Sequence, residues 1–277
     1  MRLLKQFLTV AAVAFVGTTV AGAVQDSWFL TLLAGLATAV LSVPAYAWIV
    51  RRTERRAVTE VAAQGARSAT VRGMLIGTAM FAAVIGIIYL LGGYRIDGFG
   101  SVTGAIGILG FMAAAAVTEE LLFRGVLFRI IEERIGTYLA LGLSGLVFGL
   151  AHIANPDADL WGATAIAIEA GCMLAAAYAA TRTLWLPIGL HFAWNFVQGG
   201  IFSTQVSGNG DSEGLLEGTT SGSVLLSGGE FGPEASGFAV LAGAVLTIVF
   251  LRIAHRRGNL VPRRRRDRAA ANATLAQ

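Results

Sequence analysis

Long runs of apolar residues restrict this chain more than any other feature of its sequence. Several runs approach or exceed the roughly 18 residues that a helix needs to cross a lipid bilayer. Of the 277 residues, 55% are hydrophobic and only 14% are charged, which is too apolar for a water-soluble domain of this length. A membrane-spanning β-barrel would show short strands in which apolar and polar residues alternate, and these long, unbroken apolar runs do not fit that pattern. The sequence therefore predicts an all-α, polytopic membrane helix bundle.

About eight apolar segments are expected to cross the membrane, and together they predict a single integral membrane domain over residues 1–277. Their approximate ranges are 6–24, 28–50, 73–93, 103–131, 138–155, 161–180, 184–203 and 236–254. No internal repeat is visible. Residues 204–235 are rich in Gly and Ser, carry several acidic residues, and are expected to form a loop.

The positions of lysine and arginine predict the orientation, because cytoplasmic loops carry an excess of both. Basic residues flank the expected segments at alternate ends: Arg2, Lys5, Arg51, Arg52, Arg55, Arg56, Arg67, Arg72, Arg129, Arg134, Arg182, Arg252, Arg256 and Arg257. The intervening loops are poor in positive charge, with Arg95 as the exception. Both termini are thus expected in the cytoplasm of a multi-pass cell-membrane protein, with residues 204–235 on the other side.

Each end of the chain carries a separate expectation. The first 24 residues also resemble a cleavable signal peptide, but a polytopic chain needs no separate signal, so an uncleaved first helix is favoured. Residues 256–277 form a basic tail that includes four consecutive arginines, 263–266. Anchoring beside anionic lipid accounts for this tail, so no nucleic-acid partner is expected.

Strongly polar residues inside the apolar segments are few, and each is a candidate for function because charge is costly in a bilayer. The chain contains three histidines, and two of them belong to this set. The members are Glu119, Glu120 and Arg124 in the fourth segment, His152 in the fifth, Glu169 in the sixth, and His191 and Asn195 in the seventh.

Helical spacing predicts different roles for the two adjacent glutamates. Glu120 and Arg124 are four residues apart, so they share a helix face and are expected to form an ion pair. Glu119 lies about 100° around the helix from Glu120, which leaves it free for chemistry. The Glu120–Arg124 pair taken alone would also fit a purely structural role.

The remaining polar residues are expected to lie at similar depths in the bilayer. His191 and Asn195 are four residues apart, and so are Phe148 and His152, which places an aromatic ring one turn from that imidazole. Measured from the cytoplasmic end of each helix, the depths of the polar groups range from about 10 to 21 Å at 1.5 Å per residue. They could therefore meet in one polar cavity. Glu169 lies at mid-depth too, as either a supporting or a structural residue.

One carboxylate, two imidazoles and one amide on three helices form a set suited to hydrolysis. A glutamate beside a histidine can deprotonate water. A second histidine and an asparagine can donate hydrogen bonds to an oxyanion. Taken singly, His152 would more readily be interpreted as a core histidine, but the combination favours a catalytic site.

Three ordered motifs resemble those of the CPBP intramembrane proteases. EELLFR fits EExxxR, FGLAH fits FxxxH and HFAWN fits HxxxN. The longer stretches TEELLFRGVLF and LWLPIGLHFAWNF are also similar to the family, as is GGEFGPEAS more loosely. The resemblance covers roughly residues 104–200. The family includes the type II CAAX prenyl endopeptidases and the Abi bacteriocin-processing or immunity proteins.

The resemblance implies hydrolysis of a peptide bond in a membrane-associated protein or peptide. It implies catalytic positions at Glu119, His152, His191 and Asn195, with Glu120 and Arg124 completing the first motif. Zinc remains open, because Glu119, His152 and His191 could supply two nitrogens and one carboxylate. Asn195 is a poor zinc ligand but a good oxyanion donor, which favours water activated by glutamate and histidine without bound zinc.

Two other classes of function are weighed against a protease. A transporter would place polar sites at broken helices, often in repeated halves of the chain, and neither feature is visible here. A non-catalytic membrane scaffold or immunity protein could retain the same residues without turnover. Glu119→Ala separates these classes, because it abolishes a protease and spares a scaffold.

Overall fold

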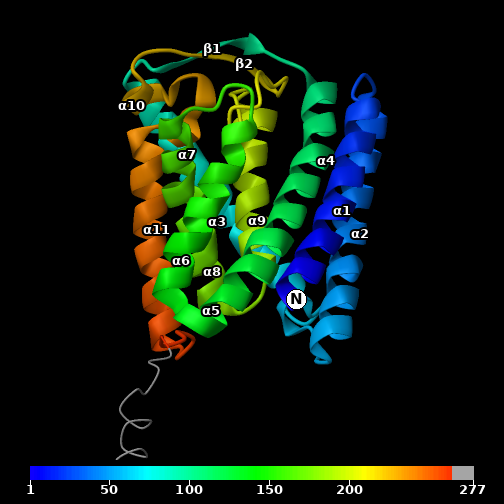
Figure 1. The fold of residues 1–277 in the computed structure, drawn as a ribbon. Helices are drawn as coiled ribbons and strands as arrows, with labels where there is room; N and C mark the ends of the chain where they lie inside the picture. The colour runs from blue at the N-terminus through cyan, green and yellow to red at the C-terminus, as the bar shows by residue number, and fades with distance from the viewer. Residues whose placement is uncertain (264–277) are drawn as a thin grey trace, which may run out of the picture.

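The computed structural model describes residues 1–263, and most of the expected basic tail, from 264 to 277, lies outside the described part. Within it the chain forms a bundle of long helices, as predicted (Figure 1). The α-helices are α1 (Arg2–Ala23), α2 (Trp28–Glu54), α3 (Ala66–Leu90), α4 (Val102–Glu119), α5 (Arg129–Ile135), α6 (Thr137–Ala151), α7 (Leu160–Ile166), α8 (Met173–Thr181), α9 (Trp185–Asn195), α10 (Val224–Ser227) and α11 (Gly237–Arg256).

Three π-helical segments interrupt this pattern. They are Glu120–Phe128 between α4 and α5, Ala167–Cys172 between α7 and α8, and Phe196–Ile201 after α9. Insertions of this kind are rare and occur often at functional sites. The first begins at Glu120, the second contains Glu169, and the third directly follows Asn195, so each adjoins a residue that the sequence singled out.

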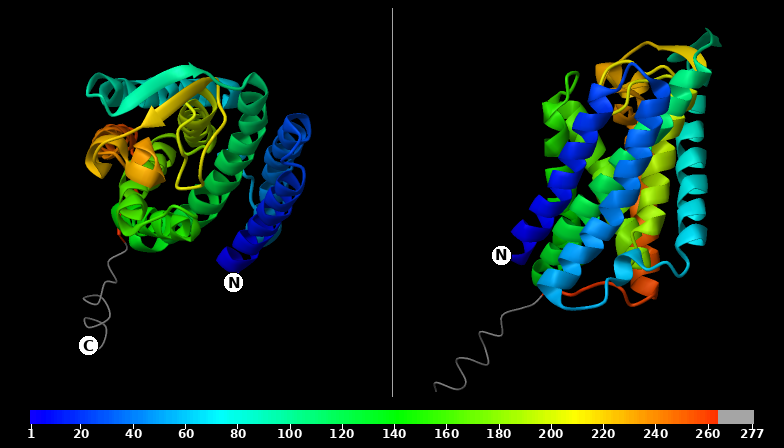
Figure 2. Two further views of the ribbon diagram at one scale, coloured as in Figure 1. Left: turned by 90° about the horizontal axis from the view of Figure 1, so that it is seen from above. Right: turned by 90° about the vertical axis from the view of Figure 1, so that its right-hand side faces the viewer.

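Among residues 1–263, seven helices are long and apolar enough to cross a membrane. They correspond to seven of the eight expected segments, and their bounds differ from the expected ones by only a few residues in most cases. The remaining segment is α9 with its π-helical extension, which is shorter and lies in the middle of the bundle (Figure 2). Met1 and the last turn of α11 lie at the same end of the bundle (Figure 1).

Side-chain caps fix where several helices begin. Ser27, Ser101 and Ser236 precede α2, α4 and α11, and each hydroxyl accepts a hydrogen bond from a backbone N–H in the first turn. Asp159 does the same for α7. Such caps satisfy backbone donors that the helix itself leaves free. These four caps therefore mark where the helices begin.

Small residues allow α9 to approach α3 at backbone distance. A Cβ added to Gly73 would lie 2.2 Å from the Leu186 carbonyl oxygen, and one added to Gly77 would lie 2.4 Å from that of Leu190. On the facing helix, a Cβ on Gly189 would lie 2.2 Å from the Thr70 carbonyl oxygen. Membrane helices associate through such close contacts, since burial from water adds little there. These glycines therefore fix α9 against α3.

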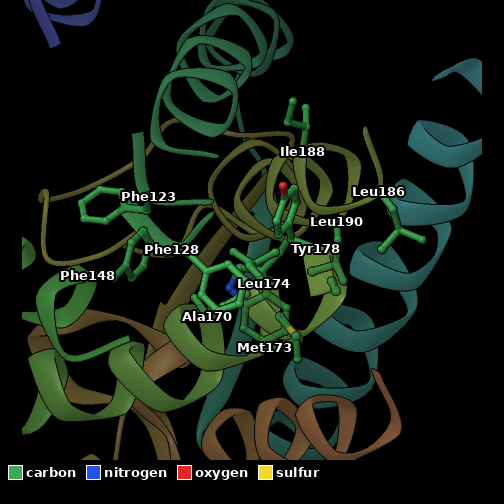
Figure 3. Packing of buried hydrophobic residues seen from close by; sticks show 14 of the residues in the cluster. Phe123, Phe128, Phe148, Ala170, Met173, Leu174, Tyr178, Leu186, Ile188 and Leu190 are labelled. Carbon is green, nitrogen blue, oxygen red and sulfur yellow. The ribbon is translucent and has the colours of Figure 1, made fainter. Parts of the chain in front are cut away.

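Buried side chains surround this central helix on its other faces. Figure 3 shows Phe123, Phe128 and Phe148 grouped on one side of the cluster, with Leu186 and Leu190 of α9 on the other. Met173, Leu174 and Tyr178 of α8 lie between these two groups (Figure 3), and the alanines of α8 from Ala175 to Ala177 are completely buried. The aromatic side of this core adjoins the polar residues described below.

Residues 202–236, here named the covering segment, close one end of the bundle. Strands β1 (Tyr94–Phe99) and β2 (Leu216–Thr220) pair antiparallel there (Figures 1 and 2). We expected residues 204–235 to form a loop, but they contain β2, α10 and two short 3-10 turns. Val206, Phe231 and Ala235 are buried. Their contacts with the bundle order this segment, and local sequence alone does not show such contacts.

Candidate active site

Glu119, the last residue of α4, lies at the centre of the polar cluster. Its Oε2 is 3.9 Å from Nε2 of His152 and 3.9 Å from Nε2 of His191. Within the described residues this oxygen has no hydrogen-bond partner, although it is buried. The side chain as a whole is 27% exposed. The structure thus brings together three residues that are far apart in sequence.

Glu120 points to a different set of partners. Its Oε1 accepts a hydrogen bond from Nη1 of Arg124 at 2.7 Å, so the expected ion pair is present. The same oxygen lies 3.0 Å from Nδ1 of His191. The two adjacent glutamates therefore contact opposite nitrogens of one imidazole. Spacing predicted that Glu119 and Glu120 diverge, but it did not reveal that both converge on His191.

Arg124 is completely enclosed, and its hydrogen bonds explain how a cation is tolerated there. Besides Glu120, it donates from Nη2 to the carbonyl oxygens of Ala170 at 3.0 Å and Gly171 at 3.2 Å. Both carbonyls belong to the π-helical segment Ala167–Cys172. Charged groups are buried only when they are paired and hydrogen-bonded. Arg124 consequently ties the first motif to the sixth apolar segment.

The Phe148 ring packs against one side of the cluster. Its ring centroid is 4.6 Å from that of His152 and 6.3 Å from that of His191. The guanidinium carbon of Arg124 lies 4.5 Å above the same ring, within the range of a cation–π interaction. The expected contact with His152 is present, and the contacts with His191 and Arg124 are additional.

The hydrogen bonds of the two histidines leave Nε2 of each ring facing Glu119. His152 Nδ1 lies 2.8 Å from the Phe148 carbonyl oxygen, which can only accept, so Nδ1 carries the proton. His191 Nδ1 likewise faces a carboxylate that already accepts from Arg124. In the neutral form of each ring, Nε2 therefore presents a lone pair toward Glu119.

Asn195 lies one turn beyond His191 on α9, as its spacing predicts. It is 7% exposed, and its side chain makes no hydrogen bond to another residue within the described part of the chain. A buried amide with free donors is suited to a charge that appears only during a reaction.

The metal-binding potential of the cluster follows from its donor atoms. Two imidazole nitrogens and one carboxylate oxygen are zinc ligands, and each imidazole has its other nitrogen hydrogen-bonded, as zinc-binding histidines do. Ligands of one tetrahedral zinc ion lie about 3.3 Å apart, closer than the 3.9 Å from Glu119 to each histidine. In residues 1–263 no group of three or more His, Cys, Asp or Glu side chains is spaced to hold an ion. The donor types fit zinc, whereas the spacing as it stands does not.

Among the described residues outside this cluster, two buried acidic residues form no salt bridge. Glu169 is 1% exposed on the π-helical segment Ala167–Cys172, where the sequence left its role open. Glu234 is 1% exposed in the covering segment, and we did not identify it from the sequence. The only sequence feature that could have identified Glu234 is its position beside Pro233 in the stretch GGEFGPEAS. An acidic residue in a Gly-rich stretch is usually solvated, so this feature did not indicate burial.

A comparison with known families agrees with the motifs. Residues 101–197 match the family model described as type II CAAX prenyl endopeptidase Rce1-like. Searches of curated proteins and of solved structures give no match. The matched range contains all three motifs and every residue of the polar cluster. Residues 101–197 are therefore similar to the type II CAAX prenyl endopeptidases, in agreement with the three motifs.

Proposed function

We propose that this protein is an intramembrane endopeptidase that hydrolyses a peptide bond of a membrane-associated protein or peptide. The observation that carries the proposal is the position of the Glu119 carboxylate, with an unpartnered Oε2 at 3.9 Å from two imidazole nitrogens. The family match at residues 101–197 supports it. A purely structural carboxylate would be expected to have an arginine or backbone partner, as Glu120 has.

Glu119 and His152 are proposed to activate the water. A water molecule about 2.8 Å from both side chains would fit between atoms 3.9 Å apart. The carboxylate and the lone pair on Nε2 would accept hydrogen bonds from the water, and one of the two would take a proton as the water oxygen attacks the peptide carbonyl carbon. The new oxygen–carbon bond forms and the carbonyl π electrons move to the carbonyl oxygen. The oxyanion then re-forms the carbonyl, the carbon–nitrogen bond breaks, and the proton passes to the leaving amine nitrogen.

His191 and Asn195 are proposed to stabilise the tetrahedral oxyanion. For this role His191 must donate from Nε2 while Nδ1 remains bonded to Glu120, so the ring must be doubly protonated. The Glu120 carboxylate would then act as its counter-ion. The Asn195 amide supplies a neutral second donor. Glu120 is thus assigned two roles, as the partner of Arg124 and as a positioning residue for His191.

Activity is proposed not to require bound zinc. Asn195 supports this reading, because an amide can donate to an oxyanion but is seldom a zinc ligand. Two measurements test it: elemental analysis of purified active protein, and activity after prolonged chelation in detergent. About one zinc per chain, with activity lost on removal and restored on its return, would contradict the proposal and make Glu119, His152 and His191 the ligand candidates.

Both termini are proposed to lie in the cytoplasm, and the covering segment on the opposite side. The clustering of arginines at the end of the bundle that holds Met1 supports this orientation. Reporter fusions at Ser27, Gly210 and the last residue would test it. An extracytoplasmic signal from the C-terminal fusion would reverse the orientation.

The decisive experiment on function compares cells that produce the wild type with cells that produce Glu119→Gln. Mass spectrometry of membrane peptides should reveal one that stays uncleaved only in the variant, at equal protein levels. The same peptide, synthesised with and without a prenyl group, then becomes the substrate for purified protein. A Glu119→Gln protein that restores every cleavage and growth phenotype of the wild type would favour a scaffold instead.

A further inference from the structure

The outer face of α2 carries a hollow that the proposed hydrolysis does not use. α1 and α2 lie at one side of the bundle (Figure 2), and only 17% of the most apolar stretch of α2 is buried inside it. The hollow has a volume of about 480 Å³, which falls within the range of sites that bind small molecules. It is lined by Pro44, Ala47, Trp48, Arg51 and Arg52.

Helical spacing explains why these side chains gather on one face. Trp48 follows Pro44 by four residues, and Arg52 follows Trp48 by four, so each lies one turn beyond the last. Arg51 follows Pro44 by seven residues, or about two turns. Pro44, Trp48, Arg51 and Arg52 are all exposed. An apolar helix face that borders lipid therefore ends in two adjacent cations.

The two exposed tryptophans of α2 place these cations at a particular depth. The 20 residues from Trp28 to Trp48 span about 30 Å, which is the thickness of the hydrocarbon core of a bilayer. Trp28 is 44% and Trp48 60% exposed, as expected of tryptophans at the two boundaries of that core. Arg51 and Arg52 follow Trp48 by about 5–6 Å along the helix axis. They therefore lie at the level of the phospholipid phosphates.

Arg51 and Arg52 differ from neighbouring arginines in having no carboxylate partner. Arg56 and Arg129 both form salt bridges with Glu54, the acidic residue of α2. In the described part of the chain, Arg51 and Arg52 form no salt bridge, and their side chains make no hydrogen bond to another residue. Glu54 itself is 5% exposed on its side chain and is directed to its own partners. The two guanidinium groups are thus available to an anion from outside the chain.

We propose that this hollow binds one anionic phospholipid, with the lipid phosphate held by Arg51 and Arg52. Guanidinium groups donate paired hydrogen bonds to phosphate oxygens, and their planar shape suits that geometry. A zwitterionic headgroup would bring its own ammonium cation beside the two arginines, whereas an anionic headgroup would not. The site is therefore selective for negative charge. It does not depend on peptide hydrolysis.

The apolar part of the same face provides a surface for the acyl chains. Val40 and Leu41 lie about two turns before Trp48, and they are 68% and 61% exposed. The Trp48 ring lies between these residues and the arginines, at the depth where the glycerol backbone of a phospholipid lies. A lipid with its phosphate on the arginines would extend its chains along this strip. The acyl chains should therefore contribute to binding, and a soluble phosphate ester should bind more weakly.

Native mass spectrometry of the full chain in detergent tests the site directly. With phosphatidylglycerol and phosphatidylcholine at equal concentrations, the wild type should retain one phosphatidylglycerol in preference. Arg51→Gln combined with Arg52→Gln should weaken this retention by about 25-fold, at about 5-fold for each arginine. Arg67→Gln is the matched control, because Arg67 is an exposed basic residue in the first turn of α3 and lies outside the hollow. It should bind as the wild type does.

Thermal unfolding in nanodiscs gives a second readout. A ligand that binds the folded state raises the melting temperature, so the wild type should melt higher in phosphatidylglycerol than in phosphatidylcholine. The double variant should lose this difference and keep the wild-type value in phosphatidylcholine, which would show that its fold is intact. An equal loss in both lipids would assign the arginines a structural role and overturn the proposal.

Two further outcomes would also overturn it. One is equal retention of phosphatidylglycerol by the wild type and the double variant, or an equal loss in Arg67→Gln. The other is displacement of the lipid by glycerol phosphate at the same concentration, which would assign the hollow to soluble phosphate esters. Retention that resists glycerol phosphate and falls in the double variant alone would support the lipid site.

Discussion

Two ionic clusters in this bundle contain similar residues but differ in how their charges are satisfied. At the end that holds Met1, Arg129 donates to Glu54 at 2.9 Å from each of two nitrogens and lies 3.1 Å from Glu60. Arg56 also contacts both of these glutamates, and the four residues are here named the arginine network. In the central cluster, by contrast, Glu119 has two imidazoles near it and no hydrogen bond from Oε2.

Exposure separates the two clusters in the same way. The side chains of Glu54 and Glu60 are 5% and 4% exposed, whereas that of Glu119 is 27% exposed. A carboxylate that is enclosed and fully paired contributes to the fold. One that is open and unpaired remains available to a substrate. The number of charged residues in a cluster therefore says little about its function. Carboxylate oxygens that lack a hydrogen-bond partner indicate a functional site better.

The largest expected effect is the loss of turnover in Glu119→Gln. Removing a general base typically costs on the order of 100- to 10,000-fold in rate, and the amide retains the shape of the side chain, so the fold should remain intact. Turnover of the identified substrate and the melting temperature of the purified protein measure the two effects separately.

Glu120→Gln should show a different pattern, with lower stability as well as lower turnover. It leaves Arg124 without its carboxylate, and breaking a buried ion pair costs roughly 3–5 kcal/mol. If both variants fold well and only Glu120→Gln is inactive, the roles of the two glutamates are reversed.

Arg129→Gln should destabilise the protein while leaving turnover per folded molecule close to normal. Glu54 and Glu60 lose a buried partner but keep Arg56, so the loss should be smaller than the roughly 3–5 kcal/mol of a buried charge left without any partner. Thermal unfolding in nanodiscs measures the loss. Arg134→Gln is the control, because Arg134 lies exposed on the same helix. Equal melting temperatures for the two variants would show that the arginine network contributes no more than a surface charge.

Asn195→Ala should lower turnover by about 100- to 1000-fold with little change in substrate affinity, as expected for the loss of one oxyanion donor. Steady-state kinetics with the identified substrate separates the two parameters. Near-normal turnover would remove the oxyanion role, whatever the outcome of the zinc analysis.

The smallest expected effect is a pH dependence of stability that arises from Glu60. Burial alone would raise the pKa of Glu60, but the hydrogen bonds from Arg56 and the charge of Arg129 outweigh it and lower the pKa below 4.5. The stabilisation is therefore present above pH 4.5 and is lost as the pH falls through the lowered value. Melting temperatures of the wild type and Glu60→Gln should converge in acid. A constant difference across the range, like that expected of exposed Asp26→Asn, would contradict this assignment.

Much of the fold and part of the site could be predicted from sequence, because the relevant signals are local. The length of the apolar runs predicted the helices, and the four-residue spacing predicted the Glu120–Arg124 pair and the Phe148–His152 contact. Contacts between segments that are distant in sequence could not be predicted in this way. Spacing within one helix did not reveal that His191 lies between two glutamates, or that Arg129, which the sequence marks only as a basic residue flanking the fourth segment, belongs to a network.

The π-helical segments explain part of this gap. A π-helical turn contains more residues than an α-helical one, so side-chain directions after Glu119 depart from those of a regular helix. Glu234 escaped notice for another reason. Its environment comes from α7 and α11 rather than from its neighbours in sequence, as the bond from Trp161 Nε1 to the Ala235 carbonyl oxygen illustrates.

Hydrogen bonds between the covering segment and the turn after His152 bear on biosynthesis. Asn155 Nδ2 donates to the Ser207 carbonyl oxygen at 2.6 Å, and Asp157 N donates to that of Gly208 at 2.9 Å. His152 leaves the ribosome well before Ser207 and Gly208, and the covering segment is fixed at its far end by the Ser236 cap of α11. A nascent chain that has inserted its first seven apolar segments thus holds all three motifs but lacks the hydrogen bonds to Ser207 and Gly208 until these residues fold back onto the turn after His152. The order of synthesis therefore delays completion of the proposed active site until the covering segment is in place.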